Sequence, residues 1–253
     1  MIFFLDWDHT DNILPANIAA NDSVTSITSR LSPDSYVFTT SVANGLKYST
    51  FGETNGMLSE INWHYVLDST TGGNVDEGNT ACLTMMFRTK DTLTGWNWIF
   101  KSPLFQISTG EALDSALNMG YFDADNTAFG TTDLAIAAAT DYLLQIKKSG
   151  NSFDWLLRDL AAETEQTQNT SDTAASGTAA QIFELSDSQT GFLGMKISHV
   201  IEFLSVTDAD CLAVKNWMLQ KYTGEDVEGE VGDASNNATF FVEMNIKTRN
   251  VGR

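Results

Sequence analysis

The chain has few of the residues that mark a secreted, nucleic-acid-binding or membrane-spanning protein. Its two cysteines, Cys82 and Cys211, are too few for a disulfide framework, so we expect reduced thiols in the core. Only 14 Lys and Arg residues stand against 33 Asp and Glu, and a net charge of −19 repels phosphate backbones. No apolar run is long enough to cross a bilayer, and the start, MIFFLDWDHT, lacks the basic segment of a signal peptide. We therefore expect a protein made in a cytoplasm, with no nucleic-acid and no membrane partner.

The chain is instead rich in segments in which apolar and polar residues alternate. This is the period of a β-strand with one buried face, and it is clear in residues 57–67, 81–88, 142–147 and 153–158. About a dozen such segments are separated by turns of Gly, Asn, Asp and Thr. The pattern predicts an all-β fold, an antiparallel jelly-roll β-sandwich.

Two polar stretches depart from this pattern. Residues 159–181 are rich in Ala, Thr, Ser and Gln without an apolar period, which predicts a long exposed loop, with a helical first turn as an alternative. Residues 225–237 hold five acids and no base, which is typical of a linker, and residues 239–248 then alternate like an additional C-terminal strand. We therefore divide the chain into a sandwich domain, 1–224, and an acidic linker with a strand arm, 225–253.

Residues 194–224 combine a strand with the one helix that the sequence predicts. In the strand, Ile197, His199, Ile201 and Phe203 are expected to share one face. A lone histidine on such a face is most often a hydrogen-bonded core residue, and a functional acid or base is the alternative for His199.

The helix has a start signal, an apolar stripe and a stop signal. Thr207 and Asp210 have the spacing of a capping box, and Gly224 stands where a helix ends. The predicted apolar stripe consists of Cys211, Val214, Met218 and Tyr222, widened by Leu212, Trp217 and Leu219. The pattern predicts an amphipathic helix that packs on the outside of the sandwich.

This order of parts resembles the laminin-G-like jelly-roll family of the concanavalin A-like lectin/glucanase superfamily. The closing elements of that family are matched by GMKISHVIEF, LSVTDAD and NWMLQKYTG, although His199 stands where an acid is usual. The opening FFLDWDHTDNILPAN and the segment ACLTMMFRTKDTLTGWNWIFKS also look like the family's first and central strands, so the resemblance covers residues 1–224. It implies the sandwich fold and, for a domain without a leader, a place among tailed-phage virion proteins.

The motifs that would indicate catalysis are missing. The glucanases of the superfamily use a strand with the spacing E-x-D-x-x-E, whereas Asp123 and Asp125 share a face here without a third carboxylate. Nucleophile-elbow, HExxH, Walker A and GxGxxG motifs are also missing. We expect a protein that is not an enzyme and has no catalytic residues.

No metal or cofactor is predicted from the sequence, with Ca²⁺ as an open alternative. Residues 123–127, DADNT, offer oxygen ligands, and lectins of the superfamily often hold such an ion, but a hydrogen-bonded turn explains the same residues. The three histidines, His9, His64 and His199, are too scattered to indicate zinc.

The residues expected at interfaces lie in two places. Trp96 and Trp98 share a strand face, where a core position is the first interpretation and a glycan platform the alternative. The C-terminal strand leaves backbone groups to pair with an edge strand of the same domain or of a neighbour. Its candidate assembly contacts are Phe240, Phe241, Val242, Met244 and Ile246.

These observations lead to one functional hypothesis and one alternative. The hypothesis is a non-enzymatic virion structural protein, a capsid decoration, cement or fibre-type subunit on the exterior of a tailed phage, made in the host cytoplasm. Its expected partners are its own copies, in a homo-oligomer, or other virion proteins. The alternative is a carbohydrate-binding lectin or host-attachment module, whose partner is a glycan of the host surface.

Overall fold

The computed structural model describes residues 3–8, 10–29, 37–39, 46–59, 65–68, 80–91, 97–101, 105–109, 118–122, 129–171, 182–186, 195–204 and 206–224. Within these ranges the chain forms strands β1 to β17, a short 3-10 helix η1 (Thr10–Asn12) and one α-helix, α1 (Asp208–Thr223). The predicted all-β fold with one helix near its end is confirmed. No helix in the described ranges has the length and apolar character needed to cross a membrane.

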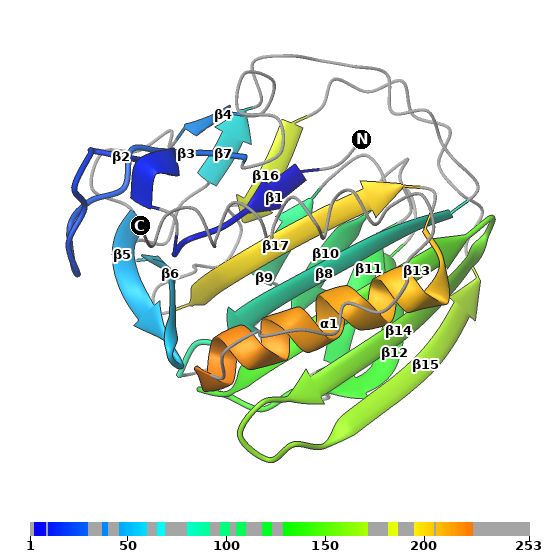
Figure 1. Ribbon diagram of the computed structural model, residues 1–253. Coiled ribbons are helices and arrows are strands. Elements are labelled where there is room, and N and C mark those ends of the chain that lie inside the picture. The colour runs from blue at the N-terminus through cyan, green and yellow to red at the C-terminus, as the bar shows by residue number, and fades with distance from the viewer. Residues whose placement is uncertain are drawn as a thin grey trace.

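The strands form two large antiparallel sheets and one small sheet (Figure 1). The first sheet has the order β15-β14-β13-β8-β17-β6-β5, with β1 also paired to β17. Its strands are β1 (Phe3–Leu5), β5 (Leu46–Phe51), β6 (Thr54–Ser59), β8 (Thr80–Arg88), β13 (Asp141–Ser149), β14 (Ser152–Asp159), β15 (Glu165–Ser171) and β17 (Lys196–Leu204).

The second sheet lies behind the first and has the order β12-β11-β10-β9-β16-β7. Its strands are β7 (Tyr65–Asp68), β9 (Asn97–Lys101), β10 (Gln106–Thr109), β11 (Asn118–Phe122), β12 (Phe129–Ala135) and β16 (Ile182–Ser186). A small sheet of β2 (Ile13–Leu14), β3 (Ser26–Thr28) and β4 (Val37–Thr39) lies beside them.

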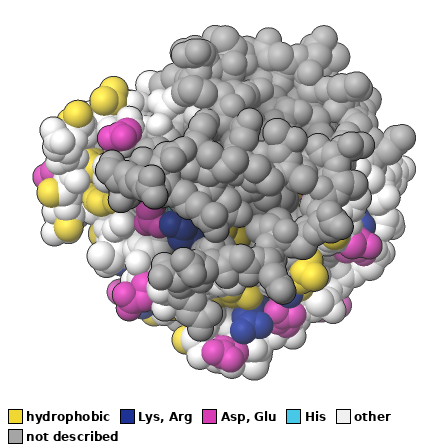
Figure 2. Space-filling model, in the orientation of Figure 1, with side chains coloured by type: hydrophobic (Ala, Val, Ile, Leu, Met, Phe, Trp, Pro, Cys, Tyr) yellow, Lys and Arg dark blue, Asp and Glu magenta, His cyan; other side chains and the backbone are white. Residues whose placement is uncertain are grey.

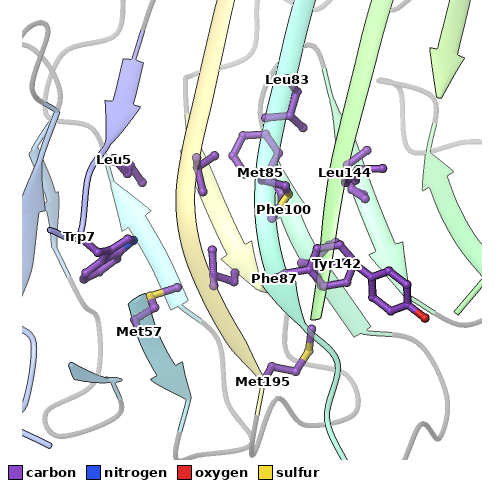
Figure 3. Packing of buried hydrophobic residues seen from close by; sticks show 14 of the residues in the cluster. Leu5, Trp7, Met57, Leu83, Met85, Phe87, Phe100, Tyr142, Leu144 and Met195 are labelled. Atoms are coloured by element: carbon purple, nitrogen blue, oxygen red, sulfur yellow. The ribbon is translucent and has the colours of Figure 1, made fainter. Parts of the chain in front are cut away.

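The apolar residues of the central strand β8 divide between two hydrophobic layers. Leu83, Met85 and Phe87 point into the core between the two sheets, where Phe100 and other residues of the second sheet meet them (Figure 3). Cys82 and Met86 point to the opposite face, toward helix α1. Both faces of β8 are therefore buried, which explains its nearly continuous apolar sequence.

The predicted face assignment of β17 is wrong at its first residue because the strand contains a bulge. Ile197 lies opposite Phe87 and Val200 opposite Met85, so one extra residue separates two positions on the same face. Ile197 therefore belongs to the core between the sheets, whereas Ile201 and Phe203 face helix α1. His199 stays on the face of Ile201 and Phe203, where its ring contacts Trp217 of α1.

Helix α1 forms as its sequence predicts, with one correction. The Thr207 side chain accepts a hydrogen bond from the Asp210 backbone amide, and the Thr207 backbone amide donates one to the Asp210 carboxylate, which completes the capping box. Gly224 ends the helix in the left-handed conformation, with φ of 72°. The stripe that packs on the sheet is Cys211, Val214, Trp217 and Met218, with Leu219 and Tyr222 partly buried. Leu212 is 52% exposed and is not part of it.

The loop predicted over residues 159–181 is wrong at 165–171, which form β15, and its part from 172 to 181 lies outside the described residues. The seven residues of β15 alternate between exposed and half-buried, and none is a large apolar residue. The strand is held by pairing with β14 and by its side chains. Gln166 accepts from the Ala135 backbone amide (2.9 Å) and donates to its carbonyl (2.9 Å), while Gln168 accepts from the Asp133 amide (2.6 Å). A polar edge strand gives no apolar period for a sequence pattern to detect.

Several predicted features lie outside the described residues. These are the linker and strand arm, 225–253, the DADNT segment, 123–127, and Trp96. Trp98 lies in β9, but its side chain is outside the description. Cys82 and Cys211 are buried free thiols, as predicted.

Candidate functional site

A groove lies beside the N-terminal half of helix α1. The helix covers β8 and β13 but leaves the outer face of β14 and β15 open, and the space between has a volume of about 530 Å³. Its walls come from α1 on one side and from β13, β14 and β15 on the other. The helix does not cover β15, because the residues of that strand are polar and offer no apolar surface to bury.

Charged side chains of both signs line the groove. Lys147 of β13 pairs with Asp208 of α1, and this hydrogen bond raises the pKa of Lys147 against the opposing effect of burial. Lys215 of α1 reaches across to Glu165 of β15 (3.2 Å), which also pairs with Arg158 (3.0 Å). Figure 2 shows acidic and basic side chains next to one another, with hydrophobic side chains between them, on the described part of this face.

Neutral polar groups and apolar surface complete the groove. Asn169 of β15 donates its amide to Asp154 (2.6 Å) and to Ser152 (2.8 Å), and all three project from the sheet surface. Leu212 of α1 and Leu156 of β14 add apolar surface. The groove thus offers carboxylate, ammonium, amide and hydroxyl groups beside apolar side chains.

A second polar cluster lies near the other end of α1 and is buried. Asp6 and Asp8 follow strand β1, His199 comes from the bulge of β17, and Lys221 comes from the last turn of α1. His199 is 0% and Asp6 1% exposed, and one donor atom from each of Asp6, Asp8 and His199 lies within 4.8 Å of the others. Antiparallel pairing of β1 with β17 brings these distant residues together.

The hydrogen bonds around His199 place a proton on its Nδ1 atom. Ser198 donates its only hydroxyl proton to the Asn55 carbonyl (2.6 Å), so at 2.9 Å His199 Nδ1 must donate to Ser198 Oγ. Nε2 then faces Asp6 Oδ1 at 3.0 Å and Asp8 Oδ2 at 3.7 Å. The order Ser–His–Asp is that of a hydrolase triad, but here the hydroxyl is committed to a carbonyl and all three residues are buried.

Asp8 is held as a carboxylate by its neighbours. Its Oδ1 accepts from Thr54 Oγ1 (2.7 Å), the Asn55 amide (3.0 Å) and Asn55 Nδ2 (3.1 Å), while its Oδ2 meets Lys221 Nζ (3.0 Å). Burial raises the pKa of Asp8, but the charges of His199 and Lys221 and the hydrogen bond from Thr54 outweigh it, and the pKa lies below its ordinary value. The same two carboxylates act on Tyr48, where burial, Asp8 and Asp6 raise the pKa to about 12.

The structure tests one of the candidate residues from the sequence and adds a cluster that the sequence did not predict. His199 is a hydrogen-bonded core histidine, as its first interpretation held. The convergence of Asp6 and Asp8 on it was missed, since Asp6 and His199 are 193 positions apart. One feature of the sequence could have indicated that these residues lie close together: the segments that hold them resemble the first and last strands of one family. The assembly contacts at 240–246 and the glycan platform of Trp96 and Trp98 stay predictions.

By sequence, the chain matches no protein-family model and no curated protein. By structure, it is similar to full-length tailspike protein 2 from an Escherichia coli O157:H7 bacteriophage, with a TM-score of 0.51, 9% identity, and coverage of 83% of this chain and 28% of that one. It is also similar to an arabinofuranosidase bound to arabinofuranosyl-α-1,2-xylobiose (TM-score 0.51, 10% identity, 80% and 51% coverage). A mutant Trypanosoma rangeli sialidase with trans-sialidase activity is a third (TM-score 0.50, 9% identity, 84% and 34% coverage).

These likenesses concern the fold alone, given such low identities. They agree with the β-sandwich that the family resemblance implies. The chain spans only 28%, 51% and 34% of the length of these three proteins.

Proposed function

We propose that this chain is a non-enzymatic structural protein on the outer surface of a tailed-phage virion, and that the groove beside α1 binds a glycan of the host cell. The observation that carries the proposal is the groove, about 530 Å³ in volume and lined by carboxylate, ammonium, amide and hydroxyl groups. This volume is within the range of small-ligand sites, roughly 300–1,000 Å³. A phage tailspike is among the proteins that share the fold, which supports a place in a virion.

The chemistry of the groove suits a polyhydroxylated ligand. Each sugar hydroxyl both donates and accepts, so a site that holds it needs acceptors and donors side by side. Asp154 and Asn169 supply such a pair on the sheet wall, and Lys147 and Asp208 supply another between the sheet and the helix. The exposed side chain of Leu212 gives the C–H face of a sugar ring an apolar surface to contact.

The surroundings of the groove carboxylates support binding without catalysis. A glycosidase needs one carboxyl that stays protonated near neutral pH, and burial in an apolar pocket is the usual cause. The side chain of Asp208 is 87% exposed and ion-paired, and Asp154 is exposed and accepts a hydrogen bond. Neither residue has the surroundings of a general acid.

A glycan array tests the proposed ligand class. The chain is expected to bind a defined subset of glycans, and Asp154→Ala to lower the signal by about tenfold, since it removes an acceptor and frees Asn169. Asp91→Ala is the matched control, because Asp91 is an exposed acid outside the groove. Equal binding by both variants, or loss of binding with Trp96→Ala alone, would place the glycan elsewhere or exclude it. Release of free sugar from the bound glycan would contradict a non-enzymatic role.

The role in assembly has its own support and its own test. Strand β15 is an edge of the first sheet, and among the described strands nothing pairs with its outer side. Such an edge can accept a strand from another copy or another virion protein. Sedimentation velocity of the full chain is expected to show a homo-oligomer, and Val242→Asp in the predicted C-terminal strand to shift it toward monomer. A monomer at all concentrations would contradict the homo-oligomer.

A further inference from the structure

The Nε2 atom of His199 faces two carboxylate oxygens. Ser198 fixes the proton of His199 on Nδ1, so the Nε2 lone pair points at Asp6 Oδ1 (3.0 Å) and Asp8 Oδ2 (3.7 Å). A lone pair facing two anionic oxygens is repelled by both. A proton, on Nε2 or on Asp6, or a metal ion removes this repulsion.

The arrangement of the donors is that of a metal-binding histidine. Histidines that bind metals use one ring nitrogen for the ion and donate the other N–H to a fixed acceptor, here Ser198 Oγ. The Asp8 carboxylate is oriented as well, since Thr54 and Asn55 hold its Oδ1, and its Oδ2 lies between His199 Nε2 and Lys221 Nζ. One imidazole nitrogen and two carboxylate oxygens make a three-donor set typical of Zn²⁺ and of other divalent first-row metals.

We propose that Asp6, Asp8 and His199 bind a divalent transition-metal ion, of which Zn²⁺ is the best match, and that Lys221 competes for the same position. The ammonium of Lys221 lies 3.0 Å from Asp8 Oδ2, where it supplies the positive charge that a metal would replace. Its side chain is 26% and that of Asp8 23% exposed, so the lysine can swing into solvent and the ion can enter from that side. This site is separate from the groove and independent of the proposed glycan.

Removal of the Lys221 charge tests the proposal, because it should strengthen Zn²⁺ binding only if these residues bind the ion. Isothermal titration calorimetry with Zn²⁺ is expected to show one ion per chain, bound about tenfold more tightly by Lys221→Gln than by the unmodified chain. The matched control is Lys215→Gln, which removes a lysine of the same helix that pairs with Glu165 in the groove, and its affinity for Zn²⁺ is expected to stay unchanged.

A second variant tests the ligands in a background that keeps the charge in balance. Asp8→Asn combined with Lys221→Gln removes one negative and one positive charge together and keeps the acceptor for Thr54 and Asn55, with circular dichroism as the check of folding. It is expected to lose at least tenfold in affinity relative to Lys221→Gln. The His199 ring ¹⁵N resonances are expected to shift at Nε2, and not at Nδ1, when Zn²⁺ is added.

Three results would overturn the proposal. The first is no stoichiometric Zn²⁺ binding by the unmodified chain or by Lys221→Gln, and the second is equal affinity in Lys221→Gln and the double variant. The third is a His199 Nε2 resonance that stays that of an N–H when Zn²⁺ is bound, because the ion would then lie elsewhere on this acidic surface.

Discussion

The two ends of helix α1 carry the same kinds of charged groups in opposite surroundings. At the N-terminal end, Lys147 pairs with Asp208 and Lys215 with Glu165 in an open groove. At the C-terminal end, Lys221 pairs with Asp8 beside the buried Asp6 and His199. Water competes for the first group but does not reach Asp6 and His199, which are 1% and 0% exposed, so the loss of a partner of these two should cost far more.

The buried end gives the sharpest way to test this comparison. Asp6→Asn removes a charge but little volume, and it leaves His199 and Lys221 facing a single carboxylate. We expect it to lower the free energy of unfolding by about 3–5 kcal/mol, the usual range for breaking a buried pair. Urea unfolding followed by circular dichroism measures this. Asp133→Asn, at an exposed position of β12, should change it by less than about 0.5 kcal/mol. Equal effects of the two would mean that the cluster is not desolvated.

The close approach of β6 to β17 also stabilises the buried cluster. A Cβ at Gly56 would lie 2.6 Å from the Ile197 carbonyl, so Gly56→Ala must push the strands apart next to the hydrogen bond from Ser198 to Asn55. We expect a loss of about 1–3 kcal/mol in thermal or urea unfolding. Gly150→Ala is the comparison. Its Cβ would meet nothing within 4 Å, and only the strain of its φ of 57° remains, roughly 1–2 kcal/mol.

At the exposed end the largest single effect should come from the helix cap. Thr207→Ala leaves the Asp210 amide without its acceptor, and we expect a loss of about 1 kcal/mol. Urea unfolding again provides the measurement. Thr223→Ala, which removes only an exposed bond to the Gln220 carbonyl in the last turn, should be close to neutral. A cost at Thr223 equal to that at Thr207 would contradict a specific role of the capping box.

The ion pairs of the groove should give the smallest effect and one that depends on pH. Burial raises the pKa of Glu165, but hydrogen bonds from Arg158 and Lys215 and their charges outweigh it and leave the pKa below the ordinary value. The folded state therefore gains stability from the Glu165 charge above the unfolded pKa, near 4.3, and loses it as the pH falls through the lowered folded pKa. The gain is at most about 1 kcal/mol because the pair is partly exposed.

The comparison of Glu165→Gln with the unmodified chain over pH measures this gain. The difference in the free energy of unfolding should be constant from pH 7 to about pH 5 and vanish at lower pH. If the difference in the free energy of unfolding grew as the pH fell, the pKa of Glu165 in the folded state would be raised and not lowered.

The helix could be predicted from the sequence because its signals are local. Thr207, Asp210 and Gly224 mark its ends, and Val214 and Met218 mark its buried face, all within the segment itself. The prediction that Leu212 belongs to the buried stripe is wrong, because the sequence of a helix does not show how far the sheet beneath it extends.

The buried cluster could not be predicted because it depends on pairing between distant segments. Asp6 reaches His199 only through the pairing of β1 with β17, and the bulge between Ile197 and Val200 moves Ile197 off the face that His199 shares with Ile201. The bulge depends on how β17 pairs with β8, and the sequence of β17 alone carries no sign of it. Strand β15 was missed for a related reason, since the partner of its Gln side chains lies in the other sheet.

The side-chain bonds of β15 limit how the two layers of the sandwich can move. Gln166 uses both its amide nitrogen and its carbonyl oxygen on a single residue, Ala135, and Gln168 holds Asp133 two positions away. A slide of one sheet over the other by even one residue would break all three bonds at once. Slow shear motions of the domain should therefore be small along the β12–β15 side.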